Sequence, residues 1–278
     1  MADDITLSSG AGVLAAIDPE IIATVETRAR AIVRGEPVSS KLVAMLALGS
    51  IPISLGALAR DVYGQAPTDV LDVLQFALLL EYLESTFYTQ GLNATGLIPA
   101  SDRGVFGTIG THETAHVSAL QALIGGKGAT PHTAPEFDFT AKGNFPGFAF
   151  VDTQYATFTI IAQAFEDTGV RAYKGQAVRL INDKAVLTQA LAIHSVEARH
   201  ACEVRRLRGR KGWITLNNRD DLPPFMQPVY EGEQNLTQGT VTVSSFGTGF
   251  GGDQAASEAF DEPLTMAQVT DIVTPFLA

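Results

Sequence analysis

Four long stretches of this chain repeat apolar residues at the spacing of an α-helix. They cover residues 69–90, 102–124, 152–173 and 183–208, and in the first the apolar stripe includes Leu74 and Leu78. Apolar residues at intervals of three and four form one helix face, which must be buried against another element. Short connections join the first stretch to the second and the third to the fourth, whereas a long one (125–146) lies between these pairs. This pattern predicts an all-α fold, a four-helix bundle with one long crossover.

The expected helix ends are marked by residues that favour caps. Gly91 and Gly175 follow the first and third stretches, and Asp152 and Asp183 precede the third and fourth. Glycine is common just after a helix and aspartate just before one. We therefore expect the first helix to stop at Gly91 and the third to run from an Asp152 cap to about Tyr173.

The segments on either side of the bundle differ from it. Residues 1–66 hold a predicted helix over about 19–34 and an uncharged run over 42–59, which suits a buried helical arm, a retained signal-like segment or a membrane anchor. Pro52 and two glycines within this run make an anchor the weakest of these, and leave a cytoplasmic or an exported (periplasmic or extracellular) protein open. After Gly209 helical periodicity is lost until a short amphipathic helix near 266–272. We predict an arm (1–66), a bundle (67–210) and a C-terminal extension (211–278) that wraps the bundle or a neighbouring subunit.

The composition excludes several classes of protein. There are 30 acidic residues against 19 basic ones, which gives a net charge of −11. Such a chain has no basic field with which to bind nucleic acid, so no nucleic-acid partner is expected. The single cysteine, Cys202, excludes an internal disulfide framework and any zinc site built from several cysteines.

Each of the four predicted helices carries one glutamate in the middle of its apolar stripe. These are Glu81, Glu113, Glu166 and Glu197. A buried, unpaired charge costs several kcal/mol. No Lys or Arg falls at a comparable inward position, and Arg171, the nearest, is displaced around its helix. Four inward carboxylates therefore need another source of positive charge.

Two histidines indicate what that source is. His116 follows Glu113 by three residues and His200 follows Glu197 by three, so each Glu-x-x-His motif puts a carboxylate and an imidazole on one helix face. The motifs fall on alternate helices, and the lone glutamates fall on the other two. Two glutamates with two Glu-x-x-His motifs in a helical bundle form a di-iron or di-manganese site, whose +4 charge balances four carboxylates.

A further regularity relates the two halves of the bundle. Tyr88 and Tyr173 each follow the lone glutamate of their own helix by seven residues. We expect both in the bundle core with the hydroxyl bonded to a glutamate, and a redox role is the alternative. Glu84 shares a helix face with its lone glutamate and is expected next to the ligands or as an extra one. His194 is expected in the core beside the ligands, and His112 at the surface.

Several strings in the sequence resemble a known family. LLLEYLESTFY, GTHETAHVSAL, AFEDTGVRAY and SVEARHACE are similar to the desiccation-related proteins of the ferritin-like superfamily, as is ASEAFDEPLTMAQV near the C-terminus, so the likeness covers residues 41–278. The arm and the extension argue against the 24-subunit cage of ordinary ferritins. The resemblance implies that Tyr88 and Tyr173 contact the metal ligands without binding the metals themselves. The metal ligands that it implies are Glu81, Glu113, His116, Glu166, Glu197 and His200.

From this site we expect oxidation of Fe(II) with oxygen or peroxide at two iron ions. Glu113 and Glu197 would bridge the metals and carry the catalysis, in a protein linked to iron handling or to oxidative and desiccation stress. One alternative is peroxide dismutation as in manganese catalase, with two Mn ions or a mixed Mn/Fe pair. Another is a structural, self-assembling scaffold with a metal staple or no metal. A homo-oligomer formed through the arm and the extension is expected.

Overall fold

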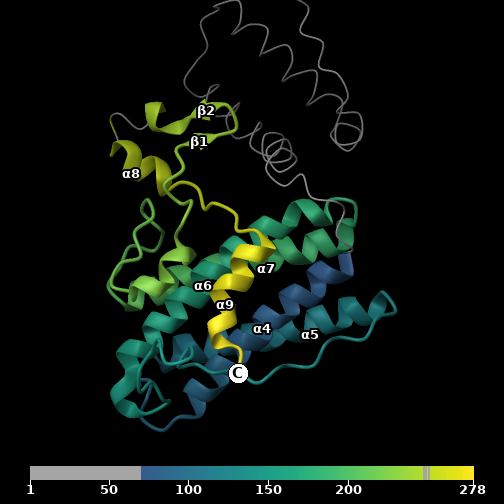
Figure 1. The fold of residues 1–278 in the computed structure, drawn as a ribbon, viewed down its shortest axis with the longest axis vertical. Helices are drawn as coiled ribbons and strands as arrows, with labels where there is room; N and C mark the ends of the chain where they lie inside the picture. The colour runs from purple at the N-terminus through teal and green to yellow at the C-terminus, as the bar shows by residue number, and fades with distance from the viewer. Residues whose placement is uncertain (1–69, 247–248, 250) are drawn as a thin grey trace, which may run out of the picture. The chain divides into compact units, whose positions relative to one another are not determined.

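The predicted all-α bundle is confirmed. The computed structural model describes residues 70–246, 249 and 251–278 (Figure 1). α4 packs chiefly on α5 and α6 on α7, and contacts of α4 with α6 and of α5 with α7 close the bundle. The predicted helix over 19–34 and the uncharged run over 42–59 lie outside the described residues. The bundle helices are α4 (Val70–Asn93), α5 (Arg103–Gly126), α6 (Tyr155–Ala177) and α7 (Lys184–Leu207).

Shorter elements lie between the bundle helices and after the bundle. Thr265 and Gln268 form a capping box at the start of α9, the amphipathic helix that the sequence predicts near 266–272. Within the described ranges, no helix is long and apolar enough to cross a bilayer. The elements are an antiparallel hairpin of β1 (Thr237–Gln238) and β2 (Val241–Thr242), α8 (Gly252–Ser257), α9 (Met266–Val273), and 3₁₀ turns at Asp152–Gln154, Val178–Leu180, Pro224–Val229, Val243–Phe246 and Thr274–Phe276.

Two of the expected helix ends are wrong. α4 and α6 each continue for two residues beyond the glycine that was expected to stop them. A side chain at Gly91 would overlap the ring of Phe158, and one at Gly175 would overlap the backbone of Leu264. These glycines therefore allow another segment to approach the helix closely. Asp152 does not cap α6 either, because it begins a 3₁₀ turn that precedes the helix.

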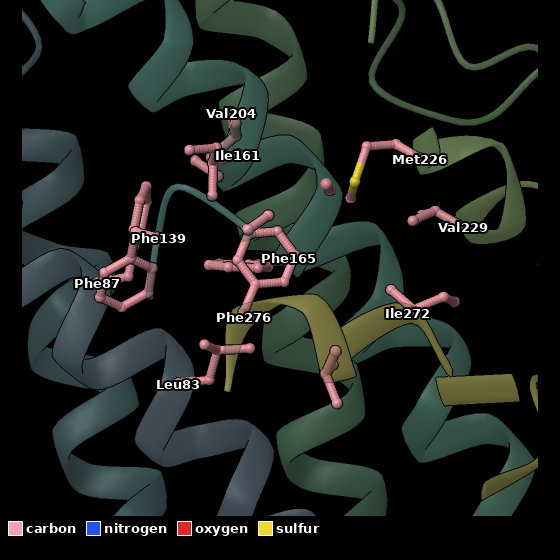
Figure 2. Close-up of a cluster of buried hydrophobic side chains, with 14 of the residues drawn as sticks. Leu83, Phe87, Phe139, Ile161, Phe165, Val204, Met226, Val229, Ile272 and Phe276 are labelled. Atoms are coloured by element: carbon pink, nitrogen blue, oxygen red, sulfur yellow. The ribbon is translucent and has the colours of Figure 1, made fainter. Parts of the chain in front are cut away.

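The largest hydrophobic cluster joins the bundle to the C-terminal extension (Figure 2). Phe276, near the end of the chain, is fully buried and lies with its ring centroid 4.8 Å from that of Phe165 on α6. Phe87 on α4 packs on Phe139 of the crossover at 5.3 Å. Met226 and other residues of the extension complete the cluster. The extension therefore wraps the bundle of its own chain and forms part of its core.

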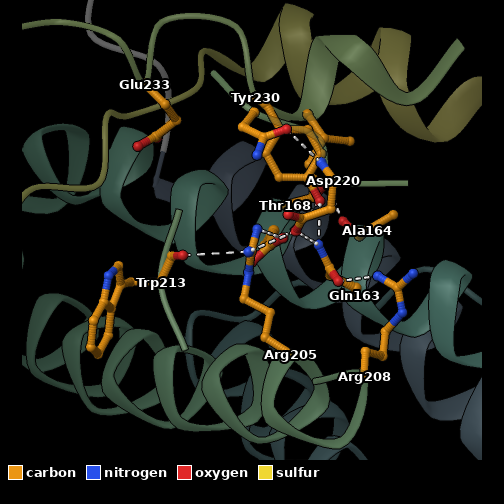
Figure 3. Close-up of polar contacts among 12 residues, drawn as sticks. Gln163, Ala164, Thr168, Arg205, Arg208, Trp213, Asp220, Tyr230 and Glu233 are labelled. Atoms are coloured by element: carbon orange, nitrogen blue, oxygen red, sulfur yellow. Dashed lines mark hydrogen bonds and ion pairs between the residues drawn. The ribbon is translucent and has the colours of Figure 1, made fainter. Parts of the chain in front are cut away.

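A buried polar network around Asp167 joins α6 to α7 and to the extension (Figure 3). Arg205 on α7 donates to both carboxylate oxygens of Asp167 on α6, at 2.9 and 2.6 Å. Tyr230 of the extension donates to the same carboxylate at 2.8 Å, and Arg205 also reaches Asp220 at 3.3 Å. Since Arg205 and Asp167 are both buried, each charge depends on this network for its partners.

Another buried arginine, Arg171 on α6, binds the extension directly. The guanidinium of Arg171 donates to the backbone carbonyls of Val229, Glu231 and Glu262, and pairs with the carboxylate of Glu233 at 2.7 Å. Nearly every residue of α6 between 158 and 176 is buried as a result. The helix that carries Glu166 is thus covered on all sides.

Candidate metal centre

All six predicted ligands meet in the centre of the bundle. Each helix supplies them from the middle of its length, where the apolar stripe turns them toward the other three helices. All six residues are at least nine-tenths buried. They are Glu81 from α4, Glu113 and His116 from α5, Glu166 from α6, and Glu197 and His200 from α7.

The six residues form two groups that share two members. In each group, one ligand atom from every residue lies within 4.8 Å of the others. Glu113 and Glu197 belong to both groups. Each shared carboxylate has two oxygens, so it can contact two ions at once. The remaining members are Glu81 and His116 in the first group and Glu166 and His200 in the second.

Each imidazole faces several carboxylates with one nitrogen. Nδ1 of His116 lies 3.0 Å from Glu113, 3.1 Å from Glu197 and 3.2 Å from Glu81. Nδ1 of His200 lies 2.7 Å from Glu113, without hydrogen-bond alignment, and 3.3 Å from Glu166. A ring nitrogen carries a single proton or a single lone pair. It cannot satisfy so many carboxylates by hydrogen bonding.

Several of these buried atoms have no hydrogen-bond partner in the described part of the chain. They include both carboxylate oxygens of Glu197, Oε1 of Glu113, Oε2 of Glu166 and Nδ1 of His200. An unpaired buried polar group costs about 1–3 kcal/mol, and more if it is charged. Cations between the carboxylates would supply what these atoms lack. Oxygen and imidazole donors of this kind suit Fe(II) and Mn(II), so the residues fit a pair of such ions.

The electrostatics of the cluster show the same deficit of positive charge. Burial raises the pKa of Glu81 to about 7 and that of Glu197 well above its usual range. Glu113 is also buried, but its hydrogen bond with His116 and the nearby charges of both imidazoles outweigh this and lower its pKa to about 2. Against the effect of burial, the surrounding carboxylates raise the pKa of His116 to about 12 and of His200 to about 11. Two imidazolium ions therefore stabilise one carboxylate, and the others ionise with difficulty.

Two tyrosines hold the carboxylates that are not shared. The hydroxyl of Tyr88 donates to Oε1 of Glu166, and that of Tyr173 donates to Oε1 of Glu81. Burial raises the pKa of both phenols well above the usual range, so they stay protonated and act as donors. In each case the tyrosine orients one oxygen and leaves the other facing the cluster.

Glu84 and His194, which the sequence predicts beside the ligands, belong to neither ligand group. Glu84 is buried beside the cluster but belongs to neither group. It shares a space beside Gly169, where a Cβ atom would lie 2.9 Å from Oε2 of Glu197 and 3.3 Å from Oε1 of Glu84. His194 is half-buried, and the charged groups that act on it are Lys174 and Asp261 of the extension side.

One contact of the site was not expected from the sequence. His112 is exposed, as predicted, but its Nδ1 lies 2.9 Å from Nε2 of His200, and the two rings stack with centroids 5.2 Å apart. Burial and the neighbouring His200 lower the pKa of His112, which favours a neutral ring that can accept a hydrogen bond. The helical spacing turns His112 away from Glu113, so only the approach of α7 reveals this contact.

A four-helix bundle with such a cluster of buried carboxylates and histidines is compatible with a di-metal site between the helices. Residues 69–210, about half of the chain, match the family model described as the ferritin-like domain. The chain therefore belongs to the ferritin-like domain family. Among curated proteins, none matches the chain. The match with the family ends at residue 210, before the extension that covers α6.

Proposed function

We propose that the protein binds two iron ions at the candidate metal centre and oxidises Fe(II) with oxygen or peroxide. The observation that carries this proposal is the pair of ligand groups that share Glu113 and Glu197. In this reading the protein takes part in iron handling or in protection from oxidative or desiccation stress, as the resemblance to the desiccation-related proteins implies.

Charge and ligand chemistry support the assignment of roles. Glu113 and Glu197 would bridge the ions, and the other carboxylates and the two histidines would each bind one ion. Four carboxylates balance two divalent cations, which would relieve the unpaired oxygens of the buried cluster. The following residues would hold the ions: Glu81, Glu113, His116, Glu166, Glu197 and His200.

The iron pair would supply two electrons: two Fe(II) become two Fe(III), while dioxygen and two protons become hydrogen peroxide, or peroxide and two protons become two waters. The chain's own part is to fix the ligands. Tyr88 and Tyr173 orient the unshared carboxylates through their hydroxyls. The apolar bundle around the cluster limits the entry of water and so strengthens its electrostatic interactions.

Elemental analysis of the protein purified from its native source, followed by Fe(II) oxidation assays, tests the proposal. We expect two irons per chain and an oxygen-dependent Fe(III) absorbance. Glu197→Ala should abolish binding and turnover, whereas Glu203→Ala, a control on the same helix in a surface ion pair with Arg206, should preserve both. Unchanged metal content in Glu197→Ala would refute the ligand assignment.

The same experiments separate the alternative functions. Manganese with peroxide dismutation would support a catalase-like enzyme. Bound metal without turnover, in a full-length protein that assembles into oligomers, would support a scaffold. Light scattering on the same sample tests the predicted homo-oligomer.

A further inference from the structure

An apolar cavity lies inside the bundle on one side of the candidate metal centre. It is lined by residues of α4, α5, α6 and α7 and by Leu180 of the turn between α6 and α7, and most of these side chains are buried. About 20 Å³ is available to the centre of a water-sized molecule. The lining is formed by Val, Leu, Phe and Ala side chains, together with Tyr173 and Gln176.

The cavity adjoins the half of the cluster that contains Glu81 and His116. Tyr173, which donates its hydroxyl to Glu81, forms part of the cavity wall. Ala77 lines the cavity one turn before Glu81 on α4, and Leu120 lines it one turn after His116 on α5. A molecule in the cavity would therefore be separated from the ligands by a single layer of side chains.

The lining selects against polar occupants. A buried water needs about two to four hydrogen-bond partners, and cavities without them stay dry. The hydroxyl proton of Tyr173 is already used on Glu81, which leaves Oε1 of Gln176 as a buried acceptor without a partner in the described part of the chain. One acceptor is too few for water or hydrogen peroxide, which would also lose their own hydrogen bonds on entry. A small apolar molecule loses none.

We propose that this cavity binds dioxygen and supplies it to the Glu81–His116 side of the metal centre. The inference rests on the proposed function and makes it more specific, because it names dioxygen as the oxidant that the interior is built to hold. Peroxide, in contrast, would have to reach the centre by another route.

Xenon, an apolar probe of similar size, tests the cavity in the metal-free protein. We expect xenon to occupy it in pressurised crystals and to shift the NMR signals of the lining methyl groups. Ala190→Leu puts extra carbon atoms into the cavity and should exclude xenon. Ala192→Leu makes the same change at an exposed position of the same helix and should not. Absence of xenon from the wild-type cavity would overturn the proposal.

Oxidation kinetics test the supply of dioxygen. Ala190→Leu should lower kcat/KM for dioxygen several-fold and leave the rate with hydrogen peroxide unchanged, while Ala192→Leu should alter neither. Ala77→Val, a smaller filling change, should have the same selective effect if Ala190→Leu fails to fold. Equal slowing with both oxidants, or no slowing with dioxygen, would overturn the proposal. A wild-type protein that binds xenon but oxidises no Fe(II) would instead refute the proposed function and leave the gas-binding cavity standing.

Discussion

In the metal-free protein, the same substitution at two members of the cluster should change stability in opposite directions. The pKa of Glu113 falls from its ordinary value of 4.5 to about 2, and that of Glu81 rises from 4.5 to about 7. At about 1.4 kcal/mol for each pKa unit, either change corresponds to about 3 kcal/mol. Ionised Glu113 stabilises the fold above pH 4.5, and this is lost as the pH falls through 2. The raised pKa of Glu81 opposes folding: the cost grows as the pH rises from 4.5 to about 7 and is constant above 7.

Urea unfolding followed by circular dichroism, with chelator present and the pH well above 7, measures both effects. Glu113→Gln should lower the free energy of unfolding by about 3 kcal/mol, because both imidazolium ions lose their paired carboxylate. Glu81→Gln should raise it by up to about 3 kcal/mol, and this gain should vanish below pH 4.5, where the carboxyl is neutral whether folded or not. With saturating metal, both variants should gain less stability than the wild type. Losses of equal size in the two metal-free variants would refute this account of the cluster.

Three further predictions concern the surroundings of the site. His112→Phe keeps the stacked ring but removes the acceptor for Nε2 of His200, so metal affinity measured by calorimetry should fall about 10–100-fold, and His112→Asn should restore part of it. Phe276→Ala should lower the free energy of unfolding by about 3–5 kcal/mol in urea titrations, since the ring is fully buried; a loss near zero would mean that the extension is not part of the core. Arg205→Leu should cost about 3–5 kcal/mol by leaving Asp167 buried and unpaired, and adding Asp167→Leu should recover most of this loss in thermal melts.

The ligand cluster was predictable because its geometry follows from helical spacing alone. Glu113 and His116 are three residues apart, and any α-helix places such a pair on one face. The apolar residues around each glutamate then fix that face toward the bundle. No contact between distant segments had to be known in advance, and the structure brings all six predicted residues together.

The contacts of the polar residues on α6 other than Glu166 were not predictable in this way. Asp167, Arg171 and Gln163 interrupt the apolar pattern there, and charged residues on the outer face of a bundle helix are normally exposed to solvent. Each has a partner within residues 220–262, far along a segment without periodicity. The helix end expected at Gly175 was wrong for the same reason. From the sequence, a glycine that ends a helix cannot be told apart from one that lets another segment pack closely on the helix.

The packing of the C-terminal extension on α6 also determines when the protein can finish folding. A ribosome makes the chain from the N-terminus, so all four bundle helices are synthesised before Val273 and Phe276 exist. Until the extension has been made, Phe165 lacks the ring of Phe276, and Arg171 lacks its carbonyl acceptors at Val229, Glu231 and Glu262. A nascent chain that already contains every residue of the candidate metal centre is therefore still an unfinished fold. If the proposed function holds, metal loading is expected to follow translation rather than accompany it.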